Sequence, residues 1–222
     1  ILHTMITAIE DTDLHLPEPE VQAAVRAAFL ELAGGQAVQP PQVVTEFPTG
    51  GDVIAYQAVL SEAGVYAVKV SPYIPQPDGA PIVTAWTLLL STRTGQPLLL
   101  ADASRLTAER TAATSAVAVD LLARPDATTL AVIGLGPIGQ AHLRHVRHVR
   151  PFGDVRVFAQ SMTHSALNDL EDVTLADSAD EAAAGADVVL LCTSAAAPVI
   201  DVTRLLAGTL VTSVSTNAPN AH

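Results

Sequence analysis

The sequence of 222 residues predicts an α/β protein, with a Rossmann-type doubly wound parallel sheet in its second half and an α+β region before it. Residues 129–213 alternate short apolar runs with helical segments, as strands buried between two helical layers require. Residues 43–100 consist of β-rich runs separated by Gly and Pro. A glycine-rich turn directly follows the first apolar run of the second half, which supports the same fold class.

The first half begins with a helix and continues as a sheet. Residues 17–33 place apolar side chains at steps of three and four and end before Gly34, which predicts an amphipathic helix. The strands expected after it are 53–58, 65–70, 81–90 and 97–100. Asp102 or Ser104 can cap a long alanine-rich helix that runs to Ala123. We expect the domain boundary to follow this helix.

The second half follows the strand and helix alternation of a nucleotide-binding fold. The expected strands are 129–133, 155–159, 173–175, 188–192 and 209–213. The expected helices are 138–149, a short one near Ser165, 179–184 and 202–206. A complete dinucleotide fold usually has a sixth strand, so we expect this domain to be incomplete at residue 222.

Composition narrows the class of protein. The formal net charge of −12 argues against nucleic-acid binding, which needs a basic face. Cys192 is the sole cysteine and cannot form an internal disulfide, which fits a reducing compartment. The first sixteen residues lack the basic start and apolar run of a signal peptide, and no apolar run is long enough to span a bilayer. We expect a cytoplasmic protein with neither nucleic acid nor membrane as a partner.

The glycine-rich run GLGPIG begins at Gly134 and predicts a Rossmann-type site for NAD or NADP. In this pattern Gly134 makes the tight turn, Gly136 lets backbone amides approach a pyrophosphate, and Gly139 lets helix and strand pack closely. Pro137 and Ile138 open the helix, whose N-terminus carries partial positive charge. The alternative interpretation is a glycine-rich strand-to-helix turn without a ligand.

The end of the second strand bears on the choice of cofactor. NAD sites usually place an acidic residue there, whereas this chain has Gln160, Ser161 and Thr163 in that segment. Without a repelling carboxylate, hydroxyl groups could hold a 2′-phosphate, which favours NADP over NAD. A solvated loop that contacts nothing is the alternative. Thr193 and Ser194 follow another strand at the edge where open α/β sheets bind ligands.

The sole lysine of the chain, Lys69, lies in an apolar strand, where an ammonium group is costly unless it has a task. A buried lysine can transfer a proton, which arginine does not readily do, so we expect Lys69 to be functional. A charge that protects an edge strand from aggregation is the alternative. Arg110 lies in the alanine-rich helix and could hold a substrate carboxylate with its planar guanidinium, or it could be an ordinary surface arginine.

Three histidines recur at every third position of a predicted helix: His142, His145 and His148. Steps of three drift around a helix, and no nearby Cys or carboxylate completes a ligand set. We therefore predict no metal site, and interpret the three as a solvated helical face.

Several separated segments together resemble the ornithine cyclodeaminase/mu-crystallin family over essentially the whole chain. They are Pro40-Pro41, Val68-Lys69-Val70, Gly95-Gln96-Pro97, Leu106-Thr107 through Arg110-Thr111-Ala112-Ala113, Arg124-Pro125-Asp126 leading into GLGPIG, and Val214 to Pro219. The resemblance implies a homodimer, with a substrate and dimerisation domain over 1–123 and a Rossmann NAD(P)-binding domain over 124–222. It also implies a C-terminal segment absent here, and NAD(P)-dependent hydride chemistry at the α-carbon of a small amino or imino acid.

The resemblance also suggests roles for individual residues. Lys69, Arg110 and Asn217 become the catalytic candidates, while Gln42 and Thr111 join Lys69 and Arg110 as substrate-binding candidates. Asn217 stands where cyclodeaminases of the family carry an aspartate, and an amide does not take up a proton at neutral pH. Gln42 stands where an arginine is common.

These departures favour reduction of a cyclic ketimine such as Δ1-pyrroline-2-carboxylate, with Lys69 polarising or protonating the imine and Arg110 holding the carboxylate. Ornithine cyclodeamination, which yields proline and ammonia, and amino-acid dehydrogenation remain alternatives within the enzymes. A non-catalytic binding protein like mu-crystallin is the alternative from another class.

Overall fold

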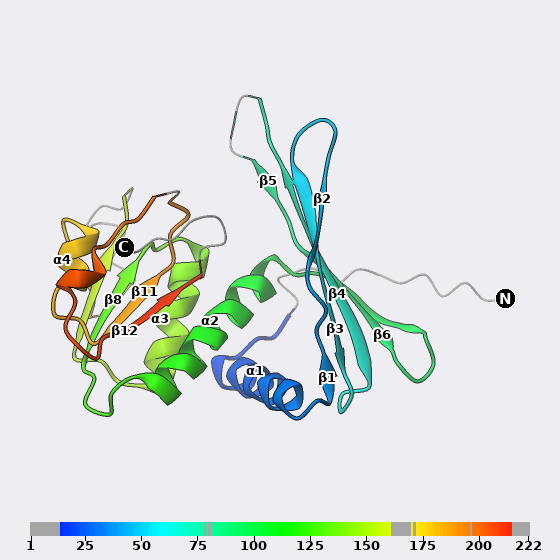
Figure 1. The fold of residues 1–222 in the computed structure, drawn as a ribbon, viewed down its shortest axis with the longest axis horizontal. Coiled ribbons are helices and arrows are strands. Elements are labelled where there is room, and N and C mark those ends of the chain that lie inside the picture. Colours follow the sequence, from blue (N-terminus) through cyan, green and yellow to red (C-terminus); the bar gives the residue numbers. More distant parts are fainter. Residues whose placement is uncertain are drawn as a thin grey trace. The chain divides into compact units, whose positions relative to one another are not determined.

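A computed structural model describes residues 14–77, 79, 81–160, 170, 172–195 and 197–214. The chain folds into two compact units. One comprises Ile1–Pro17 and Ala23–Thr107, and the other comprises Glu18–Gln22 and Ala108–His222. Each unit has its own β-sheet (Figure 1). Within the described part of the chain, no helix combines the length and apolar character needed to cross a membrane.

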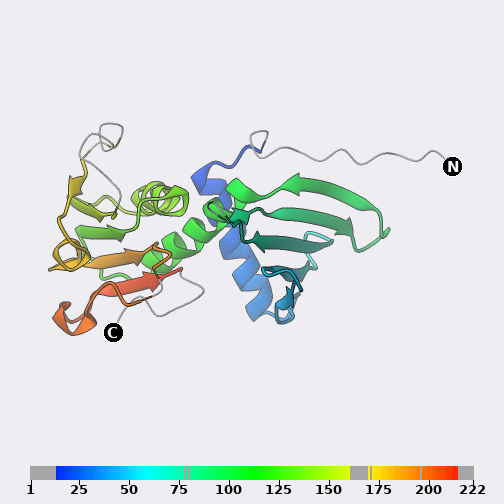
Figure 2. The ribbon, with the colours of Figure 1, turned by 90° about the horizontal axis from the view of Figure 1, so that it is seen from above.

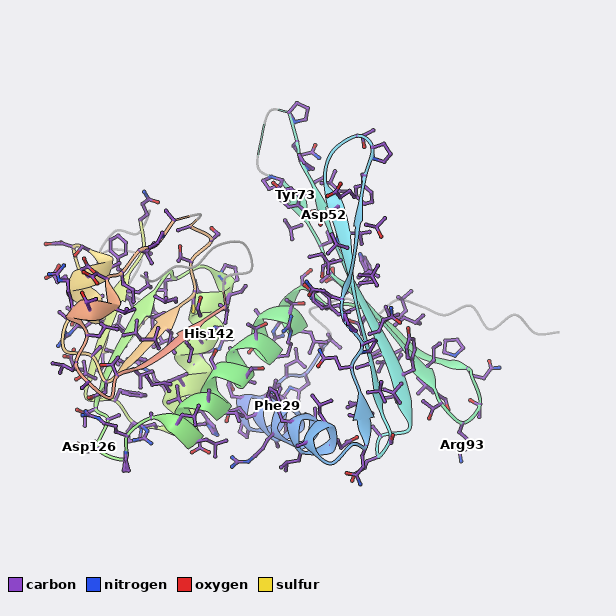
Figure 3. The ribbon with its side chains drawn as sticks, viewed as in Figure 1. Phe29, Asp52, Tyr73, Arg93, Asp126 and His142 are labelled. Atoms are coloured by element: carbon purple, nitrogen blue, oxygen red, sulfur yellow. The ribbon has the colours of Figure 1, made fainter. Side chains whose placement is uncertain are left out.

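The first unit is an antiparallel sheet preceded by most of helix α1 (Glu18–Ala33). Its strands are β1 (Ala37–Val38), β2 (Val43–Glu46), β3 (Asp52–Leu60), β4 (Val65–Ile74), β5 (Ile82–Val83), β6 (Trp86–Ser91) and β7 (Pro97–Asp102). The order is β1-β3-β4-β6-β7, with β2 added to β3 and β5 added to β4. β3 pairs with β4 along its whole length, from Leu60 opposite Val65 to Asp52 opposite Tyr73, the last two labelled in Figure 3. β4 is therefore an interior strand of the sheet.

The predicted helix and most predicted strands of this unit are confirmed, but the run 81–90 is divided in two. β5 pairs with the last two residues of β4, whereas β6 pairs with the first part of β4, from Val65 to Val70. Between them the carbonyl of Ala85 accepts a hydrogen bond from the amide of Ala103, 2.7 Å away, so this residue leaves the β4 ladder. The short strands β1 and β2 were not expected from the sequence.

The second unit is a Rossmann-type domain. Its strands β8 (Thr129–Ile133), β9 (Asp154–Phe158), β10 (Thr174–Leu175), β11 (Val188–Leu191) and β12 (Leu210–Ser213) are all parallel. Their order is β10-β9-β8-β11-β12, so the direction in which strands are added reverses at β8, as in a dinucleotide-binding sheet. Figure 2 shows the strands in a row, with β12 at one edge. The predicted α/β fold class is confirmed.

Helices cover both faces of the parallel sheet. They are α2 (Ser104–Leu122), α3 (Pro137–Val149) and α4 (Ala179–Ala183), and a short 3-10 helix, η3 (Val202–Arg204), precedes β12. Alternate residues of β8 face opposite sides: Leu130 and Val132 pack in a cluster with α2 and α3, while Ala131 and Ile133 pack in a cluster with α4. These four side chains are at most 2% exposed, so burial on both faces explains the uninterrupted apolar strands.

Of the two capping residues expected for α2, Asp102 is the one observed: its carboxylate accepts a hydrogen bond from the Ser104 amide at 2.8 Å. One element of the second unit differs from the sequence-based expectation. The helix expected at 202–206 is one 3-10 turn, capped by Asp201, which accepts from the Thr203 amide at 2.9 Å. The helix expected near Ser165 lies outside the described residues.

Candidate functional site

The turn after β8 has a geometry that only glycine allows at two positions. Gly134 has φ +94°, and a β-carbon there would lie 2.7 Å from the carbonyl oxygen of Cys192 at the end of β11. A β-carbon on Gly139, in the first turn of α3, would lie 2.0 Å from the carbonyl oxygen of Gly134. Contacts this short exclude a side chain, so both glycines are needed for strand and helix to meet.

Gly136 differs from these two because its surroundings are open. It is the N-cap of α3 with φ −67° and ψ −173°, and no other atom lies within 4 Å of a β-carbon built on it. Pro137 follows in the first helical turn, and Ile138 is 36% exposed. A helix N-terminus that ends at an open glycine presents its amides to an incoming anion. The turn therefore fits the pyrophosphate of a dinucleotide.

A cavity of about 490 Å³ lies beside this turn, at the carboxyl ends of the parallel strands. Its described lining comes from the ends of β8 and β9, from α4 and from the loop after β11: Ile133, Gly134, Phe158, Ala159, Gln160, Ala179, Thr193, Ala195, Ala197, Pro198 and Val199. Ligands of open α/β sheets bind at this edge, next to the strand where the order reverses. The volume is in the range of small-molecule and cofactor sites.

Three of the predicted cofactor-binding residues line this cavity: Gly134, Gln160 and Thr193. Ser194 is exposed and is not part of the described lining. Ser161 and Thr163 lie outside the described residues. The described lining contains neither Asp nor Glu, so the end of β9 offers Gln160 where an NAD site usually offers a carboxylate.

Cys192 lies behind the glycine turn, and the sequence alone indicates no role for it beyond packing. Burial raises the pKa of its thiol to about 12. A thiol with such a pKa stays protonated at neutral pH, so it is not a nucleophile. Its part in the site is to pack near Gly139, where an added β-carbon would lie 3.6 Å from the Cys192 β-carbon.

Lys69 lies on the interior strand β4 of the first unit, so the interpretation of an edge-strand charge is wrong. Its ammonium nitrogen lies 4.6 Å from the centre of the Tyr56 ring on β3. It also donates a hydrogen bond of 3.5 Å to the hydroxyl of Thr107 in the first turn of α2. An ammonium held by an aromatic face and a hydroxyl is placed at a defined position.

The remaining substrate candidates have different positions. Arg110 and Thr111 lie on α2, and Arg110 is exposed. The backbone carbonyl of Arg110 accepts a hydrogen bond from the Thr114 hydroxyl at 2.9 Å. Gln42 is exposed directly before β2. Asn217 lies outside the described residues. Their grouping with Lys69 around one substrate stays a prediction.

Comparison with known proteins agrees with the candidate dinucleotide site described above. The model of the ornithine cyclodeaminase/mu-crystallin family matches residues 2–222. The chain belongs to this family. The resemblance noted in separate sequence segments is thereby confirmed over nearly the whole chain.

Three named relatives are similar to this chain over nine tenths of its length or more. It is 53% identical over 208 residues to an NAD(P)H-dependent anabolic L-arginine dehydrogenase from Pseudomonas aeruginosa, covering 91% of this chain and 66% of the relative. It is 31% identical to Thermococcus litoralis Δ1-pyrroline-2-carboxylate reductase, solved with NADH and L-proline, with a TM-score of 0.85 over 95% of this chain and 69% of that one. An archaeal alanine dehydrogenase dimer with bound NAD is 28% identical, with a TM-score of 0.82 over 93% and 66%. The chain spans about two thirds of the length of these relatives.

A buried polar network in this family member was missed by sequence analysis. His142 and His145 are fully buried, so the interpretation of a solvated helical face is wrong for both. His145 contacts the Glu109 carboxylate at 2.8 Å and the Gln22 amide nitrogen at 3.2 Å. Because the Gln22 amide nitrogen only donates, His145 accepts at Nδ1 and donates from Nε2 to Glu109. Arg144 donates to the same carboxylate at 2.5 Å.

His142 has the opposite tautomer and ties α3 to α2. Its Nδ1 lies 2.7 Å from the carbonyl oxygen of Ile138, which can only accept, so Nδ1 donates. Its Nε2 lies 3.0 Å from the Ser115 hydroxyl. Burial is the main cause that lowers the pKa of both His142 and His145, against the opposing effects of the Ile138 carbonyl and of Glu109. Both imidazoles are therefore neutral at neutral pH.

No metal centre is visible among the described residues, where no three His, Cys, Asp or Glu side chains converge as ligands would. The spacing on α3 was the sequence signal for this burial. His145 lies four residues after Ala141, and Val146 lies four residues after His142, so each histidine shares a side of the helix with a buried apolar residue.

Proposed function

We propose that this protein is an NAD(P)H-dependent oxidoreductase that reduces the C=N bond of a small imino acid to the corresponding amino acid. One observation carries the proposal. A turn that only glycine can form opens onto a cavity at the carboxyl ends of a parallel sheet, in a chain 53% identical to an NAD(P)H-dependent amino-acid dehydrogenase. The alternating strands and helices support dinucleotide binding, and the identity supports the substrate class.

The residues of the chain have separate tasks in this reaction. The reduced nicotinamide, when bound, supplies a hydride to the imine carbon, and the nitrogen then needs a proton. The Lys69 ammonium can polarise the imine or donate that proton. Arg110, with Thr111 and Gln42, would hold the substrate carboxylate and fix the face of the imine that is presented. Asn217 cannot serve as a base, which disfavours ammonia loss from ornithine.

The open-chain imine of arginine is the first substrate to test, because the arginine dehydrogenase from Pseudomonas aeruginosa is 53% identical to this chain. This differs from the cyclic ketimine favoured by sequence analysis. Δ1-Pyrroline-2-carboxylate is the second candidate, supported by the likeness to the Thermococcus litoralis reductase at a TM-score of 0.85. Both substrates carry a C=N bond next to a carboxylate, so the same residue roles serve either.

The cofactor is NADP or NAD, with NADP favoured. Gln160 at the end of β9 is neutral and lines the cavity, so it does not repel a 2′-phosphate. Ser161 and Thr163, which follow it in the sequence, could donate hydrogen bonds to that phosphate.

The decisive experiment is a substrate panel with the full-length protein. Oxidation of NADPH and NADH is followed with the 2-oxo acid of arginine plus ammonia, with Δ1-pyrroline-2-carboxylate, and with pyruvate plus ammonia. Ammonia release from ornithine is measured in parallel. Steady oxidation with either of the first two supports the proposal. Ammonia release from ornithine would favour a cyclodeaminase, and tight cofactor binding without turnover would favour a binding protein.

The protein is also proposed to form a homodimer through its first unit. Several apolar side chains of that unit are about half exposed or more, among them Val43, Val44 and Val83 at 50%, 52% and 63%. Burial of such side chains against a second copy of the chain would stabilise a dimer. Light scattering after size exclusion should give twice the subunit mass, and a monomer that retains full activity would contradict the proposal. A cytoplasmic location, proposed from the single cysteine and the cofactor, is tested by cell fractionation.

A further inference from the structure

We propose that Tyr56 is a positioning residue for Lys69, holding the ammonium by a cation–π contact in the place from which it acts. The inference rests on the proposed function of Lys69. The residue pattern of the sequence indicated no role for Tyr56. The inference also goes beyond that proposed function, because it states which neighbour fixes the reacting group and by what kind of interaction.

The sheet register brings the two side chains together. Tyr56 on β3 stands directly opposite Lys69 on β4, and Thr87 on β6 stands opposite Lys69 on its other side. Residues opposite each other in an antiparallel pair project from the same face. The ammonium nitrogen is 4.6 Å from the ring centre, well inside the distance of about 6 Å at which a cation is attracted to an aromatic face.

A second contact fixes the ammonium from another direction. The Thr107 hydroxyl, on α2, accepts a hydrogen bond from it at 3.5 Å. A lysine has four rotatable side-chain bonds, and fixing them costs conformational entropy. The ring and the hydroxyl together select one arrangement before substrate arrives, so this cost does not fall on the reaction step.

The neighbours of Lys69 on the same face of the sheet differ in size. Tyr56 and Thr87 stand directly opposite it on β3 and β6. Ile54 and Leu89 lie diagonal to it on the same two strands. Of the two residues directly opposite Lys69, only Tyr56 is aromatic, so it is the one whose ring face can attract the ammonium.

The test compares three variants of the full-length protein. Y56F keeps the aromatic face, whereas Y56L removes it at similar volume. Y66L is the matched control, because Tyr66 lies on β4 three residues before Lys69, on the opposite face, where its hydroxyl donates to Gln57 at 2.9 Å. We expect kcat/KM for the imine to fall about threefold to thirtyfold in Y56L, to stay near the wild-type value in Y66L, and to be largely retained in Y56F.

Two further measurements separate positioning from general stability. Fluorinated phenylalanines introduced at position 56 weaken the ring's negative face at nearly constant shape, so kcat should fall step by step with fluorination. Lysine labelled with ¹³C at Cε gives a signal for Lys69 that is assigned by its loss in K69R. That signal should be shifted by the ring in the wild type and in Y56F, and should lose the shift in Y56L.

The outcomes distinguish this inference from the proposed function. If K69M is inactive but kcat does not change across the fluorinated series, the positioning role of Tyr56 is wrong while the reductase function stands. The same conclusion follows if Y66L loses as much activity as Y56L. If no imine is reduced by the wild type, the proposed function is wrong. In that case the Cε signal still decides whether Tyr56 holds the ammonium.

Discussion

The carbonyl oxygen of Gly134 lies 2.0 Å from the point where a β-carbon would stand on Gly139. Between the first residue of the glycine turn and the first turn of α3 there is therefore room for a hydrogen atom but not for a methyl group. Because Gly134 also has φ +94° and abuts the Cys192 carbonyl, the turn is fixed against both β11 and α3. The N-terminus of α3 is held in this way beside the cavity.

Replacing Gly139 by alanine should damage both the fold and cofactor binding. The added methyl group must displace the Gly134 carbonyl, and overpacking of this kind costs about 1–3 kcal/mol of the free energy of unfolding. The displaced turn also moves the amides proposed to bind the pyrophosphate. We expect G139A to lower the midpoint of urea unfolding and to raise the Kd for NADPH measured by calorimetry.

Replacing Gly136 by alanine should weaken cofactor binding alone. No atom lies within 4 Å of its β-carbon position and its φ is negative, so the free energy of unfolding should change little. The methyl group would instead project into the space proposed for the pyrophosphate, raising the Kd for NADPH by about tenfold or more. G153A, also in open surroundings but directly before β9 and not at the N-terminus of α3, is the control expected to alter neither quantity. Unchanged NADPH affinity in G136A would contradict the proposed site.

Gln160→Asp should shift the cofactor preference toward NADH. A carboxylate at the end of β9 repels a 2′-phosphate and accepts hydrogen bonds from a free ribose hydroxyl. The ratio of kcat/KM for NADPH to that for NADH should fall by about tenfold, equivalent to about 1.4 kcal/mol. Q160N keeps the amide and should preserve the ratio. An unchanged ratio in Q160D would place the ribose elsewhere.

The Rossmann unit was predictable from the sequence because its strands are buried on both faces. The expected bounds of β8 are the observed ones, and those of β9 and β11 differ by one residue at most. β2 was missed because all four of its residues are exposed, so no alternation of apolar and polar side chains marks it. The division of 81–90 depends on a hydrogen bond between Ala85 and Ala103, which are distant in sequence.

The glycine turn was predictable for a similar reason, since its chemistry is local to six residues. The partners of Lys69 and of the buried histidines were not, because they come from other segments. Tyr56 reaches Lys69 through the register of two strands, and Gln22 and Glu109 lie 123 and 36 residues from His145. Periodicity identifies which side of a helix is apolar, but not which polar side chain will find a distant partner there.

Lys69→Met should abolish most of the reductase activity while preserving cofactor binding. Methionine has a similar length and no proton to give, so kcat should fall by about a hundredfold or more if Lys69 is the proton donor. NADPH should bind K69M with the wild-type Kd, because the glycine turn belongs to the second unit. K69R keeps the charge but releases its proton poorly, and should be much slower than the wild type. Near-normal kcat in K69M would assign the proton to another group.

The buried histidines should make the protein less stable in mild acid. Burial lowers the pKa of His142 and His145 in the folded state below the ordinary value of 6.5 that the unfolded chain has. The unfolded state therefore binds protons first as the pH falls below about 6.5, and folding loses up to about 1.4 kcal/mol per pH unit for each histidine until its folded-state pKa is reached.

Urea unfolding at several pH values between about 5 and 8 tests this dependence on the two buried imidazoles. H142Q and H145Q should each make the free energy of unfolding less dependent on pH below 6.5, although both are less stable at neutral pH because a buried partner loses its hydrogen bond. His148 lies on the same helix but is exposed, so H148Q should retain the wild-type pH dependence. A wild-type slope in the H142Q/H145Q double variant would show that other groups cause the loss of stability, because neither imidazole would then remain to take up a proton on unfolding.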